Sequence, residues 1–127
     1  MEEQRKKILI VDDSEMNREI LVSMLEDEYD LIQAEDGQQA VYIMSEHHME
    51  LSLLLLDMNM PVMNGYEATK QIRALDNPAL AGITILAMTA NAFDEDKKKA
   101  LECGMDGFLS KPIVIEELIS ILQKNLD

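Results

Sequence analysis

The stretch Leu53-Leu-Leu-Leu-Asp57 decides the fold of this chain. Four consecutive large apolar residues that end at a charged one are typical of a central strand in a parallel sheet, where helices cover both faces. A second run of the same kind, Ile8-Leu-Ile-Val-Asp-Asp13, also ends in acids. The sequence therefore predicts two central parallel strands whose carboxyl ends carry carboxylates.

Three further aliphatic and β-branched runs are predicted as strands, at residues 31–34, 83–88 and 108–109. Segments with helical spacing of apolar residues lie between and after the strands, at residues 14–27, 36–46, 66–75, 92–103 and 115–126. In the first helix the apolar face is predicted to contain Ile20, Leu21, Met24 and Leu25. Strands that alternate with helices form βαβ units, so we predict an α/β fold with a doubly wound, five-stranded parallel (βα)₅ sheet. One domain is expected to occupy residues 1–127.

The composition is that of a soluble domain with a real core. Apolar residues make up 47% of the 127 residues, against 28% charged residues. No window reaches the roughly 18 apolar residues of a membrane span, and the N-terminal residues do not form a signal peptide. The single cysteine, Cys103, cannot form an internal disulfide, so we expect a cytoplasmic location without membrane contact.

The strong negative charge limits the partners. A formal net charge of −14 argues against nucleic-acid binding, which requires clustered lysine and arginine. Two explanations of the acidity remain open: a well-solvated surface, or carboxylates that gather around a divalent cation.

Polar side chains follow four of the five predicted strands. Asp12 and Asp13 follow the first strand, Asp57 the third, Thr89 the fourth and Lys111 the fifth. Ligands of a doubly wound sheet bind beyond the carboxyl ends of its strands, so we expect these side chains to converge. Taken singly, each has an ordinary explanation as a helix cap, a turn residue or a solvated charge. Their conjunction favours a functional site.

The chemistry of these residue types indicates phosphoryl transfer. Carboxylates held together repel one another unless a cation joins them. Oxygen ligands without histidine or cysteine favour Mg²⁺, with Mn²⁺ as a substitute. Lys111 and Thr89 add a positive charge and a hydroxyl donor that suit a phosphoryl group. The residues therefore predict a Mg²⁺-dependent carboxylate that accepts a phosphoryl group, and Asp57 is the candidate because no helix that it could cap follows it directly.

Four stretches also carry a resemblance to a known family. They are Ile8-Leu-Ile-Val-Asp-Asp-Ser14, Leu56-Asp-Met-Asn-Met-Pro-Val-Met-Asn-Gly65, Met88-Thr-Ala-Asn91 and Gly107-Phe-Leu-Ser-Lys-Pro-Ile113. In order and spacing they are similar to the response-regulator receiver domains of two-component and phosphorelay signalling. The chain is chemotaxis-regulator-like and resembles most the receivers of hybrid histidine kinases. The resemblance implies a flavodoxin-like sheet in the strand order 2-1-3-4-5.

The resemblance implies roles for the acids. Asp57 would take the phosphoryl group from a phosphohistidine on a partner, which would be a sensor or hybrid histidine kinase or a histidine phosphotransfer protein. Asp13 and Asp57 would ligate Mg²⁺ together with the backbone carbonyl of Asn59. Asp12 would act close by or through water.

The resemblance also implies a switch. Lys111 would pair with the phosphoryl oxygens, Thr89 would hydrogen-bond one of them, and Phe108 would be the aromatic switch residue. The surface of the fourth helix, fifth strand and fifth helix would then signal to a downstream target. Such a domain is a monomer or a weak, phosphorylation-dependent dimer. It is no enzyme beyond its own phosphorylation and slow autodephosphorylation.

Two other functions fit the residues less well. A small Mg²⁺-dependent aspartyl phosphatase needs a second acid just beyond its nucleophile, and Asn59 is an amide there that cannot transfer protons. A flavin-binding domain of the same topology would place phosphate at the first strand–helix turn, where Asp12 and Asp13 would repel it.

Overall fold

The structure, a computed structural model, describes residues 6–46, 51–58, 65–76, 81–89, 94–111 and 113–126. Its elements are β1 (Lys7–Val11), α1 (Glu15–Leu25), β2 (Asp30–Ala34), α2 (Gly37–Glu46), β3 (Leu51–Asp57), α3 (Gly65–Arg73), β4 (Thr84–Thr89), α5 (Asp94–Glu102), β5 (Gly107–Ser110) and α6 (Ile115–Leu126). Each strand and helix predicted from the sequence is present, and α5 and α6 are the fourth and fifth predicted helices. None of the helices in these ranges combines the length and hydropathy of a membrane span.

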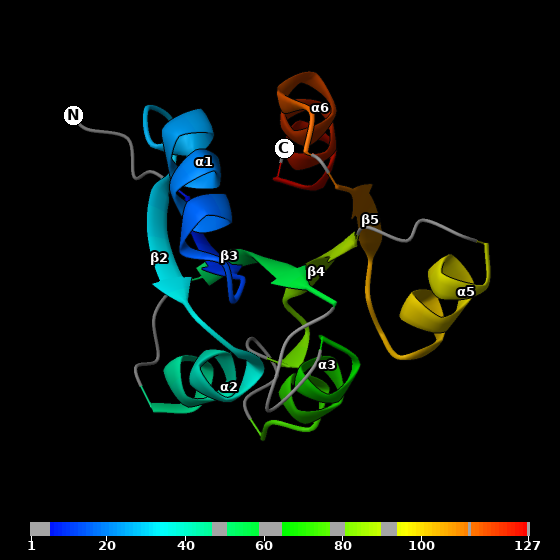
Figure 1. The fold of residues 1–127 in the computed structure, drawn as a ribbon. Helices are drawn as coiled ribbons and strands as arrows, with labels where there is room; N and C mark the ends of the chain where they lie inside the picture. The colour runs from blue at the N-terminus through cyan, green and yellow to red at the C-terminus, as the bar shows by residue number, and fades with distance from the viewer. Residues whose placement is uncertain are drawn as a thin grey trace.

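The strands form one parallel sheet in the order β2-β1-β3-β4-β5 (Figure 1), which confirms the prediction. Residues 8–11 of β1 and 53–56 of β3 are all 0% exposed, as expected of central strands covered on both faces. The long apolar runs in these strands are therefore explained by burial on both sides.

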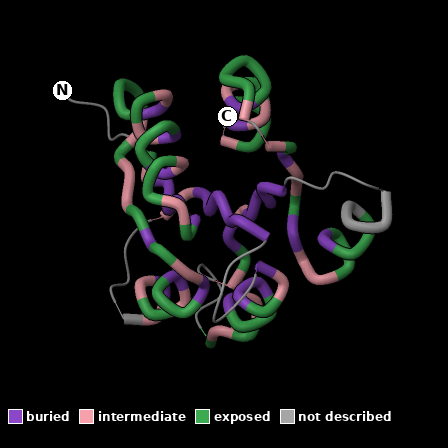
Figure 2. Tube along the Cα trace, viewed as in Figure 1, coloured by how far each residue is buried: buried purple, intermediate pink, exposed green. Residues whose placement is uncertain are grey.

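Two apolar clusters lie on opposite faces of the sheet. Leu21 of α1 and Leu118 of α6 belong to one cluster. Ala40 of α2, Ile72 of α3 and Ala100 of α5 belong to the other. Accordingly, α1 and α6 cover one face of the sheet, and α2 and α3 cover the other (Figure 1). Figure 2 shows the same layering, with the central strands buried and exposed outer sides on the helices.

Helix α1 presents most of its predicted apolar face to the core, with one exception. Ser14 is its N-cap and accepts a hydrogen bond from the backbone N–H of Asn17. The buried residues of the helix are Arg18, Leu21 and Leu25. The predicted places of Leu21, Met24 and Leu25 on the apolar face are therefore confirmed. Ile20 is 43% exposed, so its predicted place on that face was wrong. The face is centred on residues 18, 21 and 25, which leaves Ile20 at its margin.

The amino end of the sheet, where β4 and β5 begin, is joined to α3 by Arg73. The guanidinium donates to the backbone carbonyls of Ala81 at 2.8 Å, Ile83 at 2.6 Å and Gly104 at 2.9 Å. It also forms an ion pair of 2.9 Å with Asp106. Because most of its partners are fixed backbone atoms, Arg73 ties α3 to the segments that precede the two strands.

Candidate functional site

The strand register delivers four polar side chains to the carboxyl end of the sheet. Val11 pairs with Leu56, so Asp12 and Asp57 leave their strands at the same level. Asp57 pairs with Met88, and Thr89 therefore lies one residue further along β4. Lys111 follows β5, and its backbone N–H donates to the carbonyl of Thr89 at 2.7 Å.

Lys111 spans two buried acids. Its Nζ lies 3.2 Å from Oδ2 of Asp12 and 3.1 Å from Oδ1 of Asp57. The two carboxylates are nearly inaccessible, with Asp12 0% and Asp57 2% exposed. Burial alone lowers the pKa of Lys111, but the charges and hydrogen bonds of both aspartates outweigh it and raise that pKa above its ordinary value. The side chain is therefore an ammonium throughout the physiological pH range.

The loop from Asp12 to Ser14 holds the acids in place. Oδ1 of Asp12 accepts a hydrogen bond of 2.9 Å from the backbone N–H of Ser14, while Oδ2 faces Lys111. Asp12 thus stabilises the start of α1 and also takes part in the cluster, so its two explanations from the sequence are compatible. Asp13 is exposed and lies at the open side of the site.

The three acids fit a divalent cation. Asp12, Asp13 and Asp57 each offer a carboxylate oxygen, and these oxygens lie within 4.8 Å of one another. One ammonium neutralises at most one of the three charges, so a cation would relieve the remaining repulsion. Oxygen ligands of this kind favour a hard ion such as Mg²⁺. Asn59, the predicted source of a backbone ligand, lies outside the described residues.

Gly65 packs directly against the main chain of the candidate acceptor. A Cβ at this position would lie 2.8 Å from the carbonyl oxygen of Asp57 and 2.9 Å from Cα of Met58. The backbone N–H of Gly65 also donates to the carbonyl of Met58 at 3.3 Å. The close approach explains why glycine begins α3, a role that the sequence pattern alone did not distinguish from that of an ordinary turn.

The predicted switch residues lie on neighbouring strands. Thr89 is 3% exposed at the end of β4. Phe108 of β5 is half-buried and pairs in register with Ala87, and its side chain packs against the apolar cluster beneath α2, α3 and α5. Thr89 thus lies at the level of the acid cluster, and Phe108 lies on β5, the strand that leads to Lys111.

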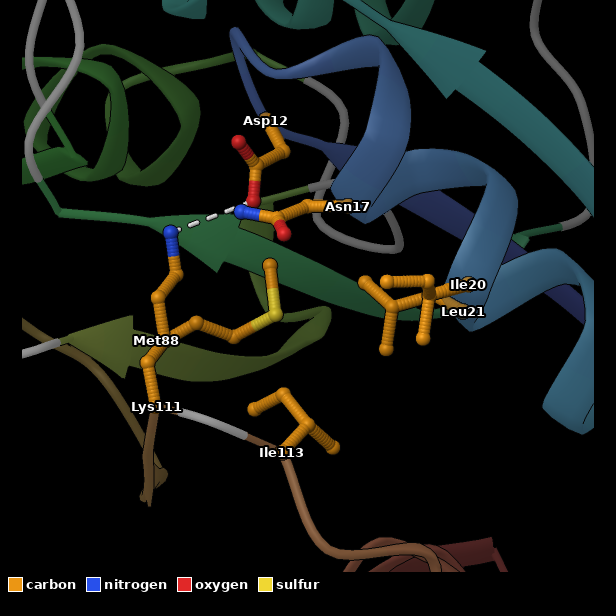
Figure 3. Close-up of a pocket in the computed structure, with 7 residues that line it drawn as sticks. All are labelled: Asp12, Asn17, Ile20, Leu21, Met88, Lys111 and Ile113. Atoms are coloured by element: carbon orange, nitrogen blue, oxygen red, sulfur yellow. Dashed lines mark hydrogen bonds and ion pairs between the residues drawn. The ribbon is translucent and has the colours of Figure 1, made fainter.

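A pocket of about 170 Å³ opens beside the acids, and the sequence did not predict it. The pocket is lined by Asp12, Asn17, Ile20, Leu21, Met88, Lys111 and Ile113. In Figure 3, Ile20 and Leu21 of α1 lie across from Met88 and Ile113, with Asp12 and Lys111 at the polar end. The partly exposed side chain of Ile20 therefore forms part of the apolar lining of this pocket, next to Asp12 and Lys111.

Comparison with known proteins identifies the class. A sequence model described as the response regulator receiver domain matches residues 8–123. The sensor histidine kinase RcsC of Escherichia coli (strain K12) is 40% identical over 112 residues, which cover 86% of this chain but 11% of the kinase. The chemotaxis protein CheY of Halobacterium salinarum is 38% identical over 108 residues, which cover 84% of this chain and 85% of CheY.

Solved structures agree with the sequence relatives. The receiver domain of the histidine kinase PA1611 from Pseudomonas aeruginosa, with a magnesium ion in its active-site cleft, has a TM-score of 0.85 at 35% identity and covers 96% of this chain and 98% of that one. The complex of the Saccharomyces cerevisiae phosphotransfer protein Ypd1 with the Ssk1 receiver domain gives a TM-score of 0.86 at 32% identity. The match covers 95% of this chain and 88% of that one. The chain belongs to the response regulator receiver family. It is a receiver domain of two-component signalling.

Proposed function

We propose that this chain is a phosphorelay receiver in which Asp57 accepts a phosphoryl group from a phosphohistidine on a partner protein. The observation that carries the proposal is the ion-paired cluster at the carboxyl end of the sheet. Within it, Lys111 Nζ lies 3.1 Å from Asp57 and the oxygens of three acids lie within 4.8 Å of one another. Family membership favours this switch over a small aspartyl phosphatase.

The transfer needs a nucleophile and compensation of charge. An oxygen of the Asp57 carboxylate attacks phosphorus, and the new P–O bond forms as the P–N bond breaks and the imidazole leaves with its electron pair. The Lys111 ammonium offsets the charge on the phosphoryl oxygens, and the Thr89 hydroxyl donates to one of them. Mg²⁺, or Mn²⁺ in its place, would be held by Asp13, Asp57 and the Asn59 carbonyl with Asp12 close by, and would supply further positive charge.

Exposed apolar residues on the segments that contribute to the pocket, α1 and the chain around Ile113, suit a protein partner. Met16 and Ile20 of α1 are 70% and 43% exposed, and Val114 and Ile115 before and at the start of α6 are 45% and 42% exposed. Apolar residues gathered next to a reactive group are a common mark of a docking surface. The partner would be a histidine phosphotransfer protein or a histidine kinase, and the Ypd1–Ssk1 complex provides a precedent.

The output would follow from a shift between two packings. Contacts from the phosphoryl group would draw Thr89 toward Asp57, and Phe108 would fill the space that Thr89 leaves. The surface of α5, β5 and α6 would then bind a downstream target. The receiver domain itself would be a monomer or a weak, phosphorylation-dependent dimer. Catalysis would be limited to the domain's own phosphorylation and slow autodephosphorylation.

Phosphorylation by a small donor tests the proposal. Wild type incubated with acetyl phosphate and Mg²⁺ should gain the mass of one acid-labile phosphoryl group, and EDTA should prevent the gain. Asp57→Asn should gain none, because an amide is not a nucleophile of this kind, whereas Asp27→Asn at an exposed control aspartate should behave as wild type. An adduct that persists in Asp57→Asn would refute the assignment.

A further inference from the structure

Arg18 is a buried cation on α1 that contacts the loop of residues 12–14, which carries Asp12 and Asp13. The residue is 8% exposed. Its Nη1 donates to the backbone carbonyl of Asp12 at 2.7 Å, and its Nε donates to Oε1 of Gln33 at 3.1 Å. Its Nη2 lies 4.0 Å from the carboxylate of Glu35, a side chain that is 66% exposed. The guanidinium thus links the loop after β1 to the end of β2 and the residue that follows it.

The hydrogen bond to Asp12 fixes more than one atom. The carbonyl of Asp12 and the N–H of Asp13 belong to the same planar peptide unit. A donor that fixes the direction of this carbonyl therefore restricts the orientation of the whole unit and the position of Asp13 that follows. The carboxylate of Asp12 is held separately by the N–H of Ser14 at 2.9 Å. Asp13, the exposed acid, depends on the main chain for its placement.

We propose that Arg18 is a positioning residue for the divalent-cation site, because it orients the Asp12–Asp13 peptide so that the Asp13 carboxylate faces Asp57. The inference rests on the proposed binding of Mg²⁺ by these acids. Gln33 takes part by holding the guanidinium in the plane that reaches the Asp12 carbonyl.

Charge and position predict opposite effects when Arg18 is removed. If the guanidinium acted only through its charge, its loss would leave the three carboxylates more negative and would tighten Mg²⁺ binding. If it acts by orienting the peptide, its loss frees Asp13 and weakens Mg²⁺ binding. The sign of the change in affinity therefore distinguishes the two roles.

The experiment is a Mg²⁺ titration of wild type and Arg18→Met, followed by backbone amide shifts in NMR spectra. The expected result is an increase in the Kd of roughly tenfold, the lower end of what loss of a ligand-orienting contact causes. The Kd of Arg18→Lys should lie between those of wild type and Arg18→Met, because an ammonium reaches the Asp12 carbonyl but cannot also hold Gln33 in the same geometry. Gln33→Ala, at an exposed position, should weaken binding by a smaller factor.

Arg73→Met is the matched control. It also removes a guanidinium that donates to backbone carbonyls, but at the amino end of the sheet. It should lower the melting temperature and leave the Kd for Mg²⁺ unchanged, which separates positioning from a general loss of stability.

The outcomes are distinct. Absence of Mg²⁺ binding by wild type would contradict the proposed function itself. Binding by wild type with an equal or lower Kd in Arg18→Met would overturn the role of Arg18 alone. If Arg18→Met does not fold, Arg18→Lys and Gln33→Ala decide the question, and unchanged affinity in both would overturn it.

Discussion

The two ends of the sheet both hold a cation, but its partners differ. At the carboxyl end, Lys111 lies 3.2 Å from Asp12 and 3.1 Å from Asp57 in a cluster of three acids, so negative charge exceeds positive charge. At the amino end, Arg73 pairs with the single acid Asp106 at 2.9 Å and donates its other hydrogen bonds to backbone carbonyls.

The difference separates stability from chemistry. A cation whose donors all meet protein acceptors, as at the amino end, completes the fold without a ligand. A cluster with excess negative charge costs folding energy and creates affinity for a further cation. The same sheet therefore carries a structural clamp, Arg73, at one end and the proposed phosphoacceptor site at the other, and substitutions at the two ends should have separable effects.

The largest effect is expected at Lys111. Lys111→Met removes the ammonium that we propose offsets the charge of the phosphoryl oxygens, so the initial rate of phosphorylation by acetyl phosphate at saturating Mg²⁺ should fall roughly a hundredfold. The Kd for Mg²⁺ should also fall, because the acids lose their internal counter-charge. Lys98→Met, at an exposed lysine of α5, is the control and should react as wild type. A normal rate in Lys111→Met would remove the lysine from the mechanism.

Arg73→Met tests the other end. The substitution leaves backbone carbonyls without their donor, and we expect a loss of about 3 kcal/mol from the free energy of unfolding. The melting temperature should fall by roughly 10 °C, as measured by circular dichroism. The phosphorylation rate at a temperature where the variant is folded should stay near that of wild type. A large loss of rate would mean that the two ends are coupled.

Two glycines give a paired comparison of smaller size. Gly65→Ala would bring a Cβ to 2.8 Å from the Asp57 carbonyl oxygen, and Gly104→Ala would place a side chain at a φ of +109°. Each should cost about 1–3 kcal/mol of stability, from a backbone clash or from strain. Only Gly65→Ala should also slow phosphorylation, because it displaces the main chain of the acceptor. Equal rates in the two variants would contradict the distinction.

The smallest expected effect is on the reactivity of Cys103. This residue directly precedes Gly104, whose carbonyl accepts a hydrogen bond from Arg73. Burial raises the pKa of its thiol above the ordinary value, against the opposing charge of Lys70. At pH 8 it should react with a thiol reagent more slowly than free cysteine, and its rate should rise about tenfold per pH unit up to its own pKa. Loss of the Arg73 charge raises the thiol pKa further and by itself slows the reaction, but local opening in Arg73→Met should outweigh this and speed it overall. Arg18→Met should leave the rate unchanged. If Arg18→Met sped the reaction and Arg73→Met did not, the assignment of Arg73 to the amino end of the sheet and of Arg18 to the carboxyl end would be wrong.

Much of the fold could be predicted because burial on both faces of β1 and β3 leaves long apolar runs. The ends of elements were less accurate. β3 begins at Leu51 and β5 extends from Gly107 to Ser110, because backbone pairing does not depend on side-chain type. The meeting of Asp12, Asp57 and Lys111 followed from where the strands end.

The sequence did not reveal the structural roles of Arg18 and Arg73. Arg73 donates mostly to backbone carbonyls, and Arg18 donates to the Asp12 carbonyl, to the Gln33 side chain and toward Glu35. Backbone carbonyls are present in every residue and Gln33 lies fifteen residues from Arg18, so no local sequence motif marks either contact set. One signal was available for Arg18: it lies three and seven residues before Leu21 and Leu25, which places a charge on the apolar face of α1. A charged residue in such a position usually needs a buried partner.

The central claim, that the carboxyl end reacts at Asp57, is tested most directly by locating the phosphoryl group. Wild type phosphorylated with acetyl phosphate and Mg²⁺ is reduced with borohydride, which converts an aspartyl phosphate to homoserine, and the peptides are sequenced by mass spectrometry. We predict homoserine at position 57 and at no other aspartate. Homoserine at Asp12 or Asp13, or a phosphorylated protein without homoserine, would contradict the account.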